Sequence, residues 1–126
     1  MWSDRRCGII PRIDTGALTG LAPGGPRRVD AWIRLGIGVV GRPEWVFVKA
    51  HCHGALARDR EALLGQQADE MFSYLEAEYG SGRYRLHYVT LREMYNIVKA
   101  AEAGLTGNPN DFRDFVIPPY DCMAGC

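Results

Sequence analysis

The fold prediction rests on one stretch, Trp45-Val46-Phe47-Val48-Lys49-Ala50-His51. Most of its side chains are β-branched or aromatic, it follows Pro43, and it ends shortly before Gly54. Such side chains pack well on a pleated, half-buried surface, and proline and glycine mark the ends of regular elements. The stretch therefore predicts a buried β-strand over residues 45–51.

The residues that follow repeat at helical spacing. Apolar side chains recur over residues 58–79, and Gly80, the usual kind of residue just past a helix C-terminus, comes directly after them. The pattern predicts one long helix over 58–79, in which Gly65 costs about 1 kcal/mol relative to alanine. The side chains expected to face inward are Leu64, Ala68, Met71, Phe72, Leu75 and Tyr79.

A second strand and a second helix are predicted further along the chain. Residues 84–89 favour a strand, and Thr90 and Glu93 fit a capping box, in which each side chain accepts a hydrogen bond from the other residue's backbone N–H. The helix is predicted over 91–103, with Gly104 as its stop. Strand, helix, strand, helix is the order of βαβα units with parallel strands and right-handed crossovers.

The remaining residues are predicted to be irregular. Residues 1–44 are rich in glycine and proline and form a loop-rich segment, in which 28–39 fits either a short strand or a helical turn. Residues 105–126 form a tail, so the 126 residues make a single domain with its βαβα core at 45–104. The βαβα order gives α/β as the expected fold class. Since a closed α/β barrel takes about 250 residues, a chain of 126 residues is expected to form only part of a deformed (β/α) barrel.

Composition and charge exclude several classes of protein. An apolar fraction of 47% with 24% charged residues is typical of a soluble globular protein. Basic and acidic residues number 15 each, so no net charge draws the chain to nucleic acid or to an anionic membrane. No membrane span or signal-peptide pattern is present, and the four cysteines lack a CxxC spacing. A cytoplasmic location with reduced cysteines is the expectation.

Three polar residues at the end of the first predicted strand are the main catalytic candidates. The two-residue period of a strand places Lys49, His51 and His53 on one face and Cys52 on the opposite, apolar face. Ligands bind beyond the carboxyl ends of parallel strands. The histidines could act as general acid or oxyanion partner, as metal ligands, or only as hydrogen-bonding residues at a loop end.

Two further groups of residues carry weaker signals. Arg28, Asp30 and Trp32 could combine a charged pair with an aromatic shelf that suits a sugar, or they could be an ordinary surface ion pair. They are the substrate-binding candidates. His87 lies within the second predicted strand, where a histidine is more often a core or edge residue than a catalyst.

Four runs of residues, 11–16, 41–55, 86–102 and 107–114, carry a family likeness. They resemble the C-terminal region of largely uncharacterised bacterial proteins related to polysaccharide deacetylases. In that family an Asp and an HxxxH pair in the N-terminal half of the barrel hold the metal, and a late histidine is the catalytic acid. The resemblance implies that His51 or His53 is this acid, that Lys49 adds positive charge, and that the parent protein removes acetyl groups from a glycan with a zinc-like divalent metal.

The sequence departs from the family pattern in its metal-binding half. It has no HxxxH motif and no early pair of aspartates at a strand end, and Cys52 stands where the pattern has threonine. The expectation is a deacetylase-like C-terminal fragment whose own residues support no cofactor. The alternative is a non-catalytic carbohydrate-binding or structural remnant with Trp32, Trp45 and Tyr84 as sugar-stacking surfaces. A homodimer, or a missing N-terminal half, would cover the open edge of a partial barrel.

Overall fold

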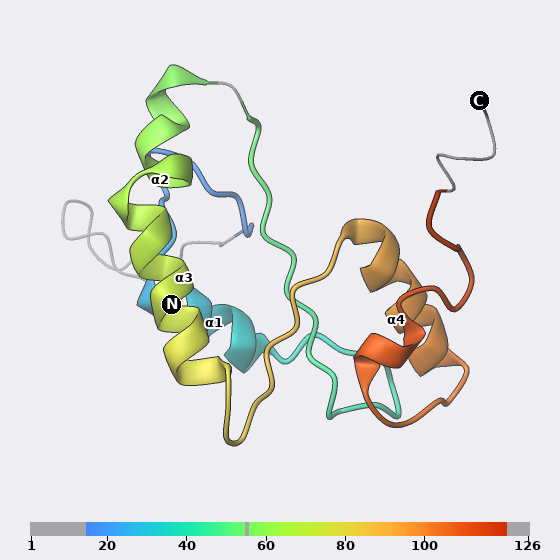
Figure 1. Ribbon diagram of the computed structural model, residues 1–126. Helices are drawn as coiled ribbons and strands as arrows, with labels where there is room; N and C mark the ends of the chain where they lie inside the picture. Colours follow the sequence, from blue (N-terminus) through green and yellow to red (C-terminus); the bar gives the residue numbers. More distant parts are fainter. Residues whose placement is uncertain (1–14, 55, 121–126) are drawn as a thin grey trace. The chain divides into compact units, whose positions relative to one another are not determined.

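The structure is a computed structural model, which describes residues 15–54 and 56–120 (Figure 1). Its elements are α1 (Pro26–Leu35), the 3₁₀ turn η1 (Ala57–Asp59), α2 (Arg60–Leu64), α3 (Gln66–Tyr79), α4 (Leu91–Glu102) and the 3₁₀ turn η2 (Pro109–Phe112). The described residues fall into two compact units. The first unit comprises residues 15–29, 49–54 and 56–74, and the second comprises 30–48 and 75–120. No helix of the described ranges has the length and apolarity needed to cross a membrane.

The prediction of a partial (β/α) barrel with parallel strands is wrong. Figure 1 shows no strand arrow over the described residues, and the segments predicted as strands, 45–51 and 84–89, are extended connections. An extended segment becomes a strand only where a neighbouring chain pairs with its N–H and C=O groups in a ladder. Among the described residues such pairing is limited to isolated bridges, which join Ala17 to His51, Thr19 to Ala22 and Val39 to Arg42. The fold is helical, not α/β.

The alternation at residues 45–51 serves the packing of a helix instead. Trp45 and Phe47 lie two residues apart, and both belong to the apolar core of the second unit. That core is built on Ile97 and Ala101 of α4, each 3% exposed. Val39, Val89 and Phe112 complete it. Aromatic and β-branched side chains cover a helix face as well as they cover a sheet, so their presence alone predicts burial and not strand pairing.

The predicted ends of α4 are confirmed. Thr90 and Glu93 form the capping box: the Thr90 side chain accepts from the Glu93 N–H, and the Glu93 carboxylate accepts from the Thr90 N–H at 2.7 Å. The helix ends at Glu102, and Gly104 follows with a φ of 77°. The N–H groups of Gly104 and its successor donate to carbonyls of the last turn, as in a Schellman motif. A left-handed residue at this position favours glycine.

The single helix predicted over 58–79 is interrupted. Helix α2 ends at Leu64 and α3 begins at Gln66, with Gly65 extended between them. The Glu61 carboxylate accepts from the Gln66 N–H at 3.2 Å and fills the space that a side chain at residue 65 would need. Two helices joined at Gly65 therefore stand in place of the one continuous helix. Of the side chains expected inside, Ala68 and Met71 are buried, whereas Leu64 and Phe72 are exposed.

The segment left open at 28–39 contains a helix. Helix α1 begins at Pro26, whose fixed φ and missing N–H suit the first position of a helix. Arg28 and Val29 are its buried residues. This helix directs the Arg28 side chain at the carbonyls of residues 17–23.

Candidate functional site

Residues 16–23 of the first unit, here called the connector, hold the segment that carries the predicted catalytic residues. The His51 N–H donates to the Gly16 carbonyl at 3.1 Å, and the His51 carbonyl accepts from the Leu18 N–H at 2.7 Å. These bonds make the parallel bridge between Ala17 and His51. His51 is therefore held through both of its backbone polar groups.

A close approach at Gly16 makes this pairing possible. Its φ is 73°, in the left-handed region. A Cβ atom at residue 16 would lie 2.8 Å from the Lys49 carbonyl oxygen. Glycine satisfies both the backbone conformation and the short separation. A side chain here would push the connector away from the segment with Lys49 and His51.

Arg28 anchors the connector from α1. Its side chain is buried, and Nη1 donates to the carbonyls of Ala22 at 2.5 Å and Pro23 at 3.0 Å. Nη2 donates to the Ala17 carbonyl at 2.9 Å. A guanidinium has five N–H donors in a rigid fork, so one side chain can hold several carbonyls. The predicted substrate-binding residue Arg28 thus positions the residue that pairs with His51.

Asp59 holds the connector at a second point, and the sequence did not indicate it. Its side chain is buried, and Oδ1 accepts from the Gly20 N–H at 2.7 Å. Gly20 is two residues from Leu18, so the segments that carry Asp59 and His51 attach at neighbouring positions of the connector. The bond joins residues 39 positions apart, and no local pattern signals such a contact.

The structure brings His51 and His53 together. Their ring centroids are 6.1 Å apart, with the planes at 86°. His51 is half-buried, while Lys49 and His53 are exposed. Cys52 is a free thiol and is exposed too, so the prediction that it faces an apolar side is wrong. Residues 49–53, here called the polar segment, therefore present hydrogen-bonding side chains from a backbone that the connector holds.

The two imidazoles do not fit a zinc-like centre. Zinc sites in proteins take three or four side-chain ligands. Within residues 15–54 and 56–120, no three His, Cys, Asp or Glu side chains gather in a group that could hold a metal ion. The metal implied by the family resemblance has no donor set in this part of the chain.

The other predicted sugar-binding residues lie in the second unit. The Asp30 carboxylate accepts from the Tyr79 hydroxyl at 2.8 Å. The Tyr84 ring packs edge-on against Tyr79, with centroids 5.3 Å apart. Trp32 is half-buried, and Trp45 is only 7% exposed. Trp45 is a core residue, and its burial leaves no ring face for a sugar to stack on.

His87 belongs to a polar network of the second unit. Its Nδ1 lies 3.1 Å from Asn110 Oδ1, and the same oxygen accepts from Arg113 Nε at 3.0 Å and Nη2 at 2.8 Å. Arg113 also pairs with Glu93 at 3.1 Å. Glu93 has a pKa below its ordinary value, chiefly because it accepts from the Thr90 N–H and also because Arg113 lies beside it. These contacts give His87 a structural role.

Asn96 is a second residue that the sequence did not indicate. It is fully buried in α4, and Nδ2 donates to the carbonyls of Arg113 at 2.6 Å and Ile117 at 2.8 Å. Its Oδ1 accepts from the N–H groups of Val116 at 3.1 Å and Ile117 at 2.8 Å. The amide therefore has partners for both N–H groups and for both lone pairs. Asn96 clamps residues 113–117 onto α4, which makes it a structural residue.

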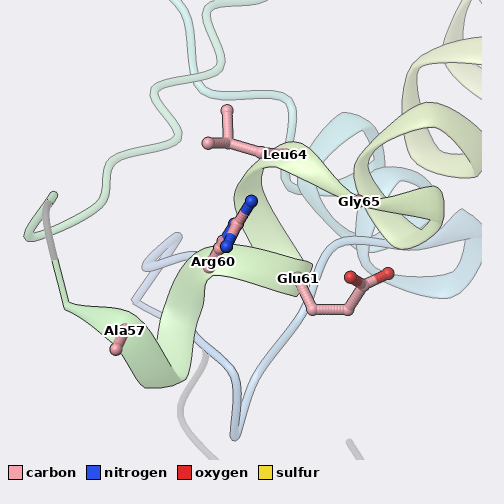
Figure 2. Close-up of a pocket in the computed structure, with 5 residues that line it drawn as sticks. All are labelled: Ala57, Arg60, Glu61, Leu64 and Gly65. Carbon is pink, nitrogen blue, oxygen red and sulfur yellow. The ribbon is translucent and has the colours of Figure 1, made fainter.

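A hollow lies beside α2 in the first unit (Figure 2). Its volume is about 440 Å³, and it is lined by Ala57, Arg60, Glu61, Leu64 and Gly65. Figure 2 shows the side chains of Arg60 and Glu61 pointing in different directions from α2. None of the predicted site residues lines this hollow.

Protein-family models, curated proteins and solved structures provide no match to this chain. The polar segment and the hollow beside α2 are therefore the basis for a functional proposal.

Proposed function

We propose that this chain binds a carbohydrate without hydrolysing it, through the polar segment. The class of ligand comes from the resemblance of residues 41–55 to polysaccharide deacetylases. Metal-assisted hydrolysis needs a donor set, and His51 and His53 have no third donor grouped with them among the described residues. Binding is the alternative that this geometry favours.

One observation carries the proposal: both backbone groups of His51 are bonded to the connector, while neighbouring side chains of the polar segment stay exposed. A held backbone lowers the entropy lost when a ligand binds. Lys49 offers three N–H donors, and an imidazole can donate or accept. Hydroxyl and acetamido groups of a sugar match both kinds of partner.

Arg28 and Asp59 are positioning residues in this proposal. Each uses its charged group on backbone groups of the connector, at Ala17 and at Gly20. They act on a ligand only through the placement of the connector and of His51. Because Trp45 is buried, sugar stacking on that ring has no part in the proposal.

The test is a titration of the full chain with acetylated and deacetylated chito-oligosaccharides, followed by calorimetry and by amide chemical shifts. We expect Lys49→Ala and His53→Ala each to weaken binding by about two- to tenfold, because a hydrogen bond contributes about 0.5–1.5 kcal/mol net. The matched control is Arg34→Ala, which removes an exposed cation of the second unit. This variant should bind like the parent chain.

Two outcomes would overturn the proposal. One is a folded protein that binds none of these oligosaccharides. The other is release of acetate that requires added zinc and is lost in His51→Ala, which would make the chain a deacetylase. The solution mass of the same samples tests the expected homodimer, because a second copy could complete a site that one chain lacks.

A further inference from the structure

We infer that the hollow beside α2 receives the carboxylate of an acidic sugar, with Arg60 as its anchor. The inference rests on the proposed function and narrows the carbohydrate to one that contains a uronic acid. The inference depends on which partners the structure gives to four consecutive charged residues, 58–61.

The run Arg58-Asp59-Arg60-Glu61 alternates in sign and suggests mutual neutralisation. In the structure both carboxylates accept hydrogen bonds from backbone N–H groups. Asp59 is buried and accepts from a connector N–H, and Glu61 accepts from the first N–H of α3. Arg58 lies 4.0 Å from Asp59, at the limit for an ion pair.

Arg60 is the member of this run whose guanidinium has no partner in the part of the chain that the structure describes. Within the described residues it forms no hydrogen bond and no ion pair, while it lines the hollow. Figure 2 shows it rising from α2 between Ala57 and Leu64, with the Glu61 carboxylate turned to the other side. Its planar fork of N–H donors matches a carboxylate in a bidentate arrangement.

The walls of the hollow suit a sugar ring. Leu64 is 83% exposed and, with Ala57 and Gly65, gives an apolar border to the guanidinium. The volume of about 440 Å³ is within the range of about 300–1,000 Å³ usual for small-ligand sites. Glu61 also lines the hollow, but its carboxylate accepts from the Gln66 N–H. Arg60 beside the apolar border fits a pyranose ring that carries a carboxylate: the C–H groups of the ring contact Leu64 and the carboxylate contacts Arg60.

The experiment compares a uronic-acid oligosaccharide with a neutral counterpart that has a hydroxymethyl group in place of each carboxylate. Arg60→Ala should weaken binding of the acidic ligand about tenfold or more, since a hydrogen bond to a charged group contributes about 1.5–3 kcal/mol, and should leave the neutral ligand unaffected. Arg60→Lys should restore part of the affinity because the charge remains without the fork. Arg58→Ala is the matched control. It removes the same charge two residues before Arg60, and the Arg58 side chain does not line the hollow.

The outcomes separate the inference from the proposed function. Equal affinity for both oligosaccharides, or equal losses in Arg58→Ala and Arg60→Ala, would overturn the inference and leave the proposed function in place. No binding of either oligosaccharide would overturn the inference as well, and the titration with chito-oligosaccharides would then decide the proposed function separately. Inorganic phosphate that competes as strongly as the free uronic acid would show a general oxyanion site and would overturn the assignment to a sugar. Circular dichroism of each variant establishes that it is folded.

Discussion

Each of the two units is stabilised internally by a different kind of contact. In the second unit, large side chains form a shared apolar core around Trp45 and Ile97. In the first unit the buried apolar side chains are mostly small, and single polar groups of Arg28 and Asp59 hold the connector. The apolar residues buried there are Val29, Ala62, Ala68 and Met71.

This difference decides what a single substitution can do in each unit. Burial of an aromatic side chain contributes several times as much free energy as one net hydrogen bond, which is worth about 1 kcal/mol. Loss of a core residue should therefore unfold the second unit. Loss of one polar anchor in the first unit should displace the polar segment while much of the fold remains.

The largest effect is expected for Trp45→Ala. Its side chain is 7% exposed and contacts the Phe112 ring at a centroid distance of 5.8 Å. Truncation of a buried tryptophan costs about 3–5 kcal/mol through lost burial and the cavity left behind. Denaturant unfolding followed by circular dichroism measures the loss. Tyr95→Ala, at an exposed position of α4, is the control and should change stability by less than about 0.5 kcal/mol. Similar losses in the two variants would mean that the core is not where the unit gains its stability.

A smaller and more local effect is expected for Arg28→Met. Methionine keeps the apolar length of the side chain but removes the guanidinium donor of three carbonyls of the connector. The Ala22 carbonyl still accepts from the Thr19 N–H, whereas those of Ala17 and Pro23 lose the Arg28 donor. A buried group without its partner costs about 1–3 kcal/mol. Hydrogen exchange should accelerate at the amides of Leu18 and His51, which form the bridge, and should stay unchanged at those of α4. Arg28→Lys should be intermediate, because one ammonium group replaces a fork of donors. Unaltered exchange at both amides would show that Arg28 does not hold the connector.

The parts that the sequence could predict are those decided by near neighbours. The Thr90–Glu93 capping box and the Gly104 stop depend on residues within one turn of each helix end, and both are confirmed. The wrong strand at 45–51 shows the limit of such patterns. Trp45 and Phe47 do alternate with a period of two, but they pack against α4, which is distant in the sequence, and not in a sheet.

The buried polar residues Asp59 and Asn96 could not be predicted for a related reason. Asp59 bonds to Gly20 and Asn96 bonds to residues 113–117, so each contact exists only after distant segments meet. In a sequence both residues look like solvent-exposed polar positions. The sequence predicts a continuous helix through Gly65, with only a small cost for the glycine. The Glu61 carboxylate, by capping α3 at Gln66, stabilises the break instead.

The smallest effect concerns Glu93 and depends on pH. The Thr90 N–H is the main cause that holds the pKa of Glu93 below its ordinary value of 4.5, and Arg113 and the Thr90 hydroxyl add to it. A carboxyl group whose pKa is lower in the folded state favours folding fully above the unfolded value, and that contribution is lost as the pH falls through the folded pKa. Glu93→Gln keeps the length of the side chain and removes this titration.

We therefore expect Glu93→Gln to be less stable than the parent chain at neutral pH and the difference to shrink as the pH falls below 4.5. Thermal unfolding of both proteins across a series of pH values measures it. Glu44→Gln is a useful comparison, because the pKa of Glu44 is also lowered, chiefly by its own backbone N–H and then by Arg42, outside any helix. A difference at Glu93 that stays constant with pH would mean that the cap acts through its hydrogen-bonding shape and not through its charge. A difference that follows the titration would show that the negative charge of Glu93, which faces the Thr90 N–H and Arg113, stabilises the start of α4.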